Sequence, residues 1–231
     1  NEIKKAQIVR RVPTVATRLQ VVPIGANIEP AEGVTWHPRS GGRQTLLAFG
    51  IVMPRRRIEL LIATLKELVA GGIDADLCVA GRIQNSAYAA QCLQMANELG
   101  IADRVTFTGT LAPETVTELF LRSSLSLHAA EEGLISSSGA LLAAFAHGVP
   151  VVGARTQTDE AMLLQATLPA LSDARDIARV VTSALDDTAS RVRAGTLGRQ
   201  LYRGQFEWAH IAELTARSFN LNQKVTYAAG L

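Results

Sequence analysis

Aromatic residues and net charge are both scarce in this sequence. Phenylalanine, tyrosine and tryptophan make up 5% of the 231 residues, although hydrophobic residues together make up 48%. That hydrophobic share excludes a disordered chain and suffices for the core of one large domain, or of one domain with extensions. A core with so few aromatics favours helices packed on a parallel sheet over a sandwich of aromatic-rich strands. The net charge of +2 is too small to indicate a nucleic-acid-binding surface.

Cysteine is also scarce, and its placement argues against disulfides and metal binding. The two cysteines, Cys78 and Cys92, fall in a predicted buried strand and in the helix after it. Neither has a metal-ligand partner nearby in the sequence, so we expect reduced thiols in or near the core of a cytosolic protein. The histidines are scattered, and we expect no metal site from them; they are His37, His128, His147 and His210.

Several segments and motifs are missing. The longest apolar run, 139–154, is too short to span a bilayer and is interrupted by His147, Gly148 and Pro150. The residues after Asn1 do not resemble a signal peptide, and a start without methionine leads us to expect part of a longer protein. The motifs GxGxxG, GxxxxGK(S/T), GxSxG and HExxH are absent, which argues against standard dinucleotide, P-loop, hydrolase and zincin sites.

Strand and helix patterns alternate along the chain. Continuous apolar runs predict buried strands, and apolar residues at helical spacing between them predict helices. The predicted strands span 18–24, 45–50, 75–80, 104–108, 124–128 and 149–152. The predicted helices span 54–70, 86–99, 112–121, 138–147, 174–185, 189–202 and 206–219. This alternation predicts an α/β fold with a Rossmann-like, doubly wound parallel sheet.

Four loops follow strands and are expected at one edge of that sheet. The segment 126–154 predicts a strand–loop–helix–strand crossover whose acidic loop spans 131–139. Loops 50–57, 81–83 and 109–111 follow three other strands. In open parallel sheets, ligands bind in a crevice at the carboxyl ends of the strands. The sequence therefore predicts the ligand-binding edge as well as the fold.

The chemistry of these loops suits a diphosphate. Arg55, Arg56 and Arg57 are cationic, glycine allows close backbone approach, and helix starts near 55, 112 and 138 would direct N–H groups toward the crevice. The alternative is that these are ordinary strand-ending glycines and a solvated helix start. The loops by themselves leave both readings open.

Six segments, taken in order, resemble the carboxyl-terminal half of family 4 (group 1) glycosyltransferases of the GT-B fold. They are VVPIGANI (21–28), AFGIVMPRRRIELLIATLKEL (48–68), LCVAGRI (77–83), LGIADRVTFTGTLAPETVTELFLRSSLSL (99–127), HGVPVVGA (147–154) and FEWAHIAE (206–213). The fourth segment is the most specific. The resemblance implies a nucleotide-sugar-binding domain, 18–219, preceded by a remnant or linker, 1–17, from a missing amino-terminal acceptor domain and followed by a tail, 220–231.

The chain departs from the family pattern where catalysis is expected. The family's phosphate-contacting arginine falls on Ile51 and its lysine on Arg56, whose guanidinium would still bind a diphosphate. The first glutamate of the family's EGFGxxxxE pair falls on Glu132, whereas the second falls on Ala143. Loss of a ribose-binding carboxylate is expected to cost about 1–3 kcal/mol of donor affinity. Some members have a GxSxRRGS loop, of which 133–139 keeps the glycines but not the arginines.

The resemblance assigns catalytic roles to Glu132 and Arg56. The residues expected to contact the donor are Gly50, Ile51, Arg55, Arg56, Gly81, Arg82, Thr110, Leu111, His128, Glu132, Gly133, Leu134, Ile135, Ser136, Ser138 and Gly139. Glu132 has the alternative of an exposed loop acid, and His128 that of a core residue. The serines 136–138 are expected mainly to cap the following helix. Trp208 is expected to be a core anchor for the last helix.

The favoured function is the donor-binding domain of a hexosyltransferase-like enzyme. It would transfer a sugar from a nucleotide diphosphate to an unknown acceptor with retention, using no metal or other cofactor. We expect this chain alone to bind donor weakly and to transfer nothing. The alternative is a degenerate, non-catalytic nucleotide- or sugar-binding module or scaffold, motivated by Ile51, Ser138 and Ala143.

The resemblance also implies the setting in which the protein works. We expect a bacterial, cytoplasmic protein of polysaccharide or glycoconjugate biosynthesis, located in the cytosol or at the inner face of the membrane. Its partners would be the nucleotide-sugar donor and the missing acceptor domain, with no nucleic acid and with peripheral membrane contact through the missing half.

Overall fold

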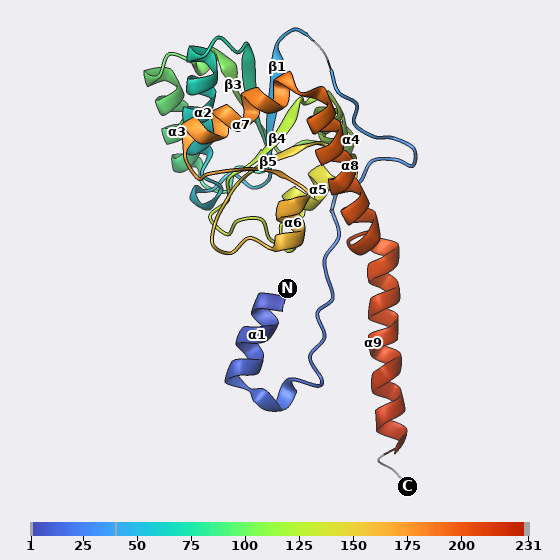
Figure 1. Cartoon of the computed structure of the whole chain (residues 1–231). Coiled ribbons are helices and arrows are strands. Elements are labelled where there is room, and N and C mark those ends of the chain that lie inside the picture. Colours follow the sequence, from blue (N-terminus) through green and yellow to red (C-terminus); the bar gives the residue numbers. More distant parts are fainter. Residues whose placement is uncertain (1, 40, 229–231) are drawn as a thin grey trace.

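A computed structural model describes residues 2–39 and 41–228, which form an α/β body with helical extensions (Figure 1). Six parallel strands lie in the order β3-β2-β1-β4-β5-β6. Their bounds are β1 Gln44–Phe49, β2 Ala75–Ala80, β3 Val105–Gly109, β4 Leu125–His128, β5 Val151–Ala154 and β6 Leu168–Ala170. This arrangement confirms the predicted Rossmann-like α/β fold.

The central strands are apolar because both faces of the sheet are covered. Leu46 and Leu47 of β1 are each 0% exposed, although successive side chains of a strand point to opposite faces. One face packs against α2 (Ile58–Ala70), α3 (Ser86–Glu98) and α7 (Ala174–Asp186). The other packs against α4 (Pro113–Arg122), α5 (Gly139–His147) and α8 (Thr188–Gln205).

The remaining helices are short or extend from the body. The short helix α6 (Ala161–Gln165) precedes β6, and 3-10 turns cover Pro13–Val15, Pro54–Arg56 and Ala102–Arg104. The helices α1 (Glu2–Arg11) and α9 (Trp208–Ala228) both extend to the same side of the body (Figure 1). Among the described residues, no helix is both long and apolar enough to cross a membrane.

The strand order positions the site. From β1 the chain builds outward through β2 and β3, and then returns so that β4 pairs with the other side of β1. The loops after β1 and β4 therefore diverge to opposite faces of the sheet and leave a crevice between them. This switch point is where open α/β sheets bind ligands.

Three sequence predictions require correction. Residues 18–24 form no strand and pair with no other strand of the described chain, even though their composition is typical of one. The structure adds β6, an edge strand whose three residues include Pro169 and are too few for a pattern to detect. The tail is helical as far as Ala228, because α9 continues past Phe219; residues 229–231 lie outside the described part.

Trp208 also departs from its expected place in the core. Its side chain is 47% exposed, and its Nε1 donates a hydrogen bond to the Ala26 carbonyl at 2.8 Å. A Cβ on Gly25 would lie 2.6 Å from the indole ring. Trp208 thus anchors the start of α9 to the 25–26 turn from the surface.

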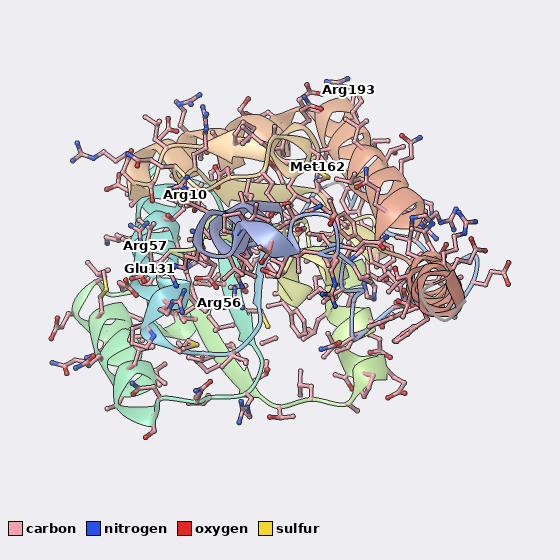
Figure 2. The ribbon with its side chains drawn as sticks, turned by 90° about the horizontal axis from the view of Figure 1, so that it is seen from below. Arg10, Arg56, Arg57, Glu131, Met162 and Arg193 are labelled. Atoms are coloured by element: carbon pink, nitrogen blue, oxygen red, sulfur yellow. The ribbon has the colours of Figure 1, made fainter. Side chains whose placement is uncertain are left out.

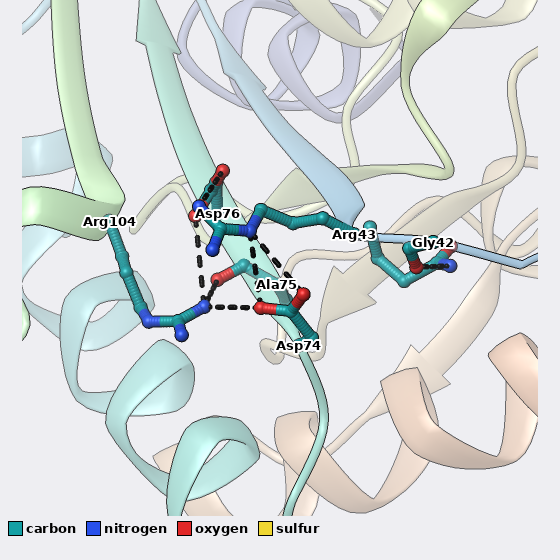
Figure 3. Close-up of polar contacts among 7 residues, drawn as sticks. Gly42, Arg43, Asp74, Ala75, Asp76 and Arg104 are labelled. Carbon is teal, nitrogen blue, oxygen red and sulfur yellow. Dashed lines mark hydrogen bonds and ion pairs between the residues drawn. The ribbon is translucent and has the colours of Figure 1, made fainter.

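A charged cluster holds the opposite, amino edge of the sheet (Figure 3). Arg104 Nη1 lies 2.7 Å from Asp74 Oδ1, and Arg43 Nη1 lies 3.5 Å from Asp76 Oδ2. The hydrogen bond from Arg104 lowers the pKa of Asp74, with a further contribution from Arg43. These residues come from the starts of β1, β2 and β3, so the cluster joins three strands at the edge away from the crevice.

Candidate functional site

The loops after β1, β2 and β3 are joined backbone to backbone. The Gly50 N–H donates to the Ala80 carbonyl at 2.9 Å, and the Gly81 N–H donates to the Gly109 carbonyl at 3.1 Å. Gly81 has φ of 140°, and a Cβ at this position would lie 2.0 Å from the Gly50 oxygen. Only glycine fits at position 81, because the two loops approach each other this closely.

These loops form one wall of a cavity of about 340 Å³ at the switch point. Eight residues predicted to contact a donor line it, namely Gly50, Ile51, Arg56, Gly81, Arg82, Thr110, Leu111 and Gly139. The cavity also includes six residues that the prediction omitted, namely Asn27, Ile28, Phe49, Val116, Ala140 and Ala143. Arg56 and Arg82 are its only charged lining residues within the described chain. The cavity therefore combines a cationic edge with a largely apolar floor.

Arg56 faces Glu132 next to this cavity. Arg56 Nη1 lies 3.8 Å from Glu132 Oε1, and Arg55 Nη2 lies 3.6 Å from Glu132 Oε2. The Arg56 side chain is 19% exposed and that of Glu132 is 24% exposed. Arg56 Nη1 and Glu132 Oε2 are buried atoms without a hydrogen-bond partner. The pair therefore leaves donor and acceptor capacity that a polar ligand would satisfy.

The turn that carries these arginines is tied to the acidic loop. The Glu131 N–H donates to the Arg55 carbonyl at 2.9 Å, and Arg56, Arg57 and Glu131 gather on the side of the body from which α1 extends (Figure 2). The predicted helix start near 55 is a three-residue 3-10 turn, and α2 begins only at Ile58. Between them Arg57 adopts a left-handed conformation with φ of 52°, and its Nη1 donates to Ser172 Oγ.

Much of the 133–138 loop faces away from the cavity. Leu134 is fully buried, packs against Gly153 and donates its N–H to Asp159 at 2.8 Å. A Cβ on Gly133 would lie 2.1 Å from Thr156 Oγ1. Ser136 bonds Glu160 through its N–H and its hydroxyl, both at 3.1 Å. The segment after β5 thus takes the hydrogen bonds of Leu134 and Ser136, two residues predicted to contact a ligand.

Several predicted contacts consequently lie outside the cavity lining. They are Arg55, His128, Glu132, Gly133, Leu134, Ile135, Ser136 and Ser138. The buried Leu134 side chain is a correction, because it belongs to the core. Ser138 caps α5 as predicted, accepting a hydrogen bond from the Leu141 N–H at 3.4 Å.

His128 lies behind Arg56 and is 7% exposed. Its Nε2 lies 3.3 Å from the Gly133 carbonyl oxygen, so the neutral ring donates a hydrogen bond from Nε2–H to that oxygen. Burial, and secondarily the charge of Arg56, lowers the pKa of His128 to about 4. His128 is therefore neutral at pH 7. Its burial and its bond to the loop favour the interpretation of a core residue over that of a ligand contact.

The omitted cavity residues had a partial signal in the sequence. Asn27 and Ile28 belong to the VVPIGANI segment, which carries part of the family resemblance but no predicted donor contact. At Ala143, the only signal in the sequence is that the family has a glutamate at this position. Within the described residues, no group of three or more histidine, cysteine, aspartate or glutamate side chains is arranged to hold a metal ion.

Comparisons with known proteins agree with this fold. The sequence model of the family described as "Glycosyl transferases group 1" matches residues 43–187. No curated protein sequence matches the chain at a significant level.

Solved structures of glycosyltransferases are similar in fold. HepE from Anabaena, solved with UDP and glucose, superposes with a TM-score of 0.67 at 16% identity, covering 77% of this chain and 48% of its own. Sucrose-phosphate synthase from Thermosynechococcus elongatus superposes with a TM-score of 0.74 at 18% identity, covering 97% of this chain and 57% of its own. The carboxyl-terminal domain of the group 1 protein LpcC from Francisella tularensis superposes with a TM-score of 0.61 at 13% identity, covering 81% of this chain and 97% of its own. The chain thus spans about half the length of the two longer proteins and nearly all of the isolated domain.

Proposed function

Because this chain belongs to the group 1 glycosyltransferases, we propose that it is the donor-binding domain of an enzyme that transfers a sugar from a nucleoside diphosphate to an acceptor. The observation that carries this proposal is the incompletely paired Arg56 and Glu132 beside the switch-point cavity. The free N–H of the Arg56 guanidinium could bind a diphosphate, and the free oxygen of the Glu132 carboxylate could accept a hydrogen bond from a sugar hydroxyl. The Anabaena neighbour, solved with UDP-glucose, supports the ligand class.

Arg56 is the proposed contact to the diphosphate. A guanidinium binds phosphate oxygens through two parallel hydrogen bonds, so it stabilises the charge that builds on the leaving diphosphate. The start of α5 at Gly139 adds a positive helix end at the cavity wall. This chemistry needs no metal, and it is compatible with the retention that the family resemblance implies.

Glu132 is the proposed acceptor of hydrogen bonds from the donor sugar. It lies next to Arg56 and outside the cavity lining, so a sugar attached to a diphosphate at Arg56 would extend toward it. The cavity floor at Ala143 offers no carboxylate to the ribose. We therefore propose weak donor binding by this chain, and transfer only when an acceptor domain is present.

The test is donor turnover by this chain joined to the acceptor domain that the proposal requires, with Glu132→Gln compared with Glu131→Gln. Glu131 is a matched control, because its side chain is 58% exposed and, among the described residues, forms an ion pair only with Arg55, at 4.0 Å. We expect Glu132→Gln to reduce turnover by about a hundredfold, the scale of one lost transition-state contact, and Glu131→Gln to leave it nearly unchanged. Equal activity of the two variants would contradict the role of Glu132.

The second candidate function is a non-catalytic nucleotide- or sugar-binding module. It is favoured by Ala143 and by the 133–138 loop, in which Asp159 accepts from the Leu134 N–H and Glu160 accepts from Ser136. Nucleotide binding without turnover of any donor, in the presence of an acceptor domain, would favour this function over the enzyme.

A further inference from the structure

Helix α8 carries three arginines that form no ion pair within the described chain. Arg191, Arg199 and Arg203 lie in one row at four-residue spacing, with Gly195 at the position between the first two. Residues four apart lie on the same face of a helix. The exposed Arg193, by contrast, lies 3.6 Å from Asp187 and faces solvent (Figure 2).

Arg191 is the least expected member of this row. It is 3% exposed, yet only its Nη2 has a side-chain partner, the Thr188 hydroxyl at 3.0 Å. Its Nε and Nη1 are buried without any hydrogen bond. Burial lowers the pKa of Arg191, because no nearby charge compensates it. A buried guanidinium usually has a carboxylate partner, and this one has none among the described residues.

The same helix lines a hollow of about 590 Å³. Its other wall is the segment 33–38. The lining residues are Gly33, Thr35, Trp36, His37, Pro38, Gly148, Val192, Gly195, Thr196, Arg199, Gln200 and Arg203. None is acidic, and none lines the switch-point cavity. The hollow therefore offers cations and neutral donors beside an apolar wall.

Both walls are fixed in place. The Trp36 N–H donates to the His147 carbonyl at 2.9 Å, and its Nε1 donates to the Ser123 carbonyl at 2.6 Å. On the other wall, a Cβ on Gly195 would lie 2.2 Å from the Gly148 oxygen, so α8 packs directly on the end of α5. The hollow is thus a preformed feature of the fold.

The acidic residues nearby do not neutralise the arginines. Glu29, Glu32 and Glu207 line a neighbouring hollow that shares Arg199 and Arg203. No carboxylate of the described chain lies within ion-pairing distance of either arginine. Burial and the charge of Arg203 lower the pKa of Arg199, as expected for crowded cations.

We propose that the hollow between residues 33–38 and α8 binds a phosphate-bearing anion. Arg199 and Arg203, which line the hollow, would contact the phosphate oxygens. His37 and Gln200 supply further hydrogen-bond donors, and Trp36 and Val192 would pack against the apolar part of the ligand. The source of the phosphate is a soluble phosphate ester or the head group of an anionic lipid. This site is independent of the proposed donor site.

The test is calorimetric titration with inorganic pyrophosphate in an Arg56→Gln background, which disables the donor cavity. We expect the double variant Arg199→Gln/Arg203→Gln to weaken binding by about tenfold or more, and Arg193→Gln on the same helix to change it by less than about twofold. Co-sedimentation with phosphatidylglycerol-containing and pure phosphatidylcholine vesicles distinguishes a lipid source from a soluble one.

A second readout covers variants that fail to fold. The chain has two tryptophans, so its NMR spectrum contains two indole N–H signals. In the Arg56→Gln chain, bound phosphate should shift the signal of Trp36 and leave that of Trp208 in place. The proposal is overturned if the double variant binds pyrophosphate like its parent, if Trp36 does not respond, or if the parent binds neither probe at millimolar concentration.

Discussion

Arg56 Nη1 and Glu132 Oε1 lie 3.8 Å apart, close enough for attraction but beyond hydrogen-bonding distance. Each residue also has a buried polar atom without a partner, Nη1 of Arg56 and Oε2 of Glu132. The turn and the loop that carry them are joined through Glu131 and Arg55, so the separation of the two side chains is held by the backbone. The arrangement is therefore open to a ligand that contacts both groups.

Replacing Glu132 by glutamine should separate phosphate binding from sugar binding. Removal of the carboxylate leaves Arg56 uncompensated, so affinity for a free nucleoside diphosphate should rise about three- to tenfold, the range for a partly screened charge pair. Affinity for the corresponding nucleotide sugar should gain less, because glutamine is a weaker acceptor for its hydroxyls. Titration calorimetry with UDP and UDP-glucose measures both changes. Equal changes for the two ligands would argue against a sugar contact at Glu132.

Gly81→Ala should strongly destabilise the fold and the cavity. The new methyl would lie 2.0 Å from the Gly50 oxygen, and alanine is strained at φ of 140°. We expect a loss of about 2 kcal/mol or more of unfolding free energy, measured by urea denaturation. Gly204→Ala in α8 is the matched control, because nothing lies within 4 Å of its Cβ position. That control should gain about 0.5–1 kcal/mol, and equal effects at the two positions would contradict the close approach.

Substitutions at Arg57 should separate backbone strain from side-chain bonding. Arg57→Gly relieves the left-handed conformation but loses the hydrogen bond to Ser172, so its stability should stay close to that of the parent. Arg57→Ala keeps the strain and loses the bond. The glycine variant should therefore be more stable than the alanine variant by about 1 kcal/mol in thermal or urea unfolding. An alanine variant as stable as the glycine variant would rule out this strain.

Acid should destabilise the chain through His128. Its pKa falls from 6.5 to about 4 on folding, so between those values the unfolded state binds a proton that the folded state does not. Stability is therefore retained above pH 6.5 and lost as the pH falls toward 4, by on the order of 3 kcal/mol for this residue. His128→Gln should flatten the pH dependence of unfolding over this window. Burial also lowers the pKa of His147, so a residual slope of the same sign should persist. If His128→Gln leaves the pH dependence of the unfolding free energy unchanged, groups other than His128 cause it.

The sheet and the ligand-binding edge could be predicted from sequence because they rest on local patterns. Apolar runs such as that around Leu46 and Leu47 give buried strands, and the glycines at 50, 81 and 109 mark where those strands end. The 18–24 run is also rich in apolar residues, but it pairs with no strand of the described chain, a property that only the tertiary arrangement decides. Residues 168–170 pair with β5 in spite of Pro169, because an edge strand needs bonds on one side only.

The site was predicted less completely because side-chain direction depends on long-range contacts. Residues that follow strands directly, such as Gly50 and Thr110, line the cavity as expected. Leu134 and Ser136 do not, because Asp159 and Glu160, some 25 positions later in the chain, take their hydrogen bonds. No pattern within the 131–139 loop encodes that contact. Ala143 reaches the cavity floor because α5 packs tightly against Gly50 through Ala140.

The most direct test of the donor-domain proposal is isothermal titration of this chain with UDP, GDP, ADP and TDP, repeated with Arg56→Ala and Glu132→Ala. The proposal predicts that one nucleotide binds selectively and that Arg56→Ala weakens its binding by about tenfold or more. Binding that is indifferent to Arg56→Ala would contradict the proposal. So would a failure of every nucleotide to bind to this chain at millimolar concentration, both with and without an acceptor domain.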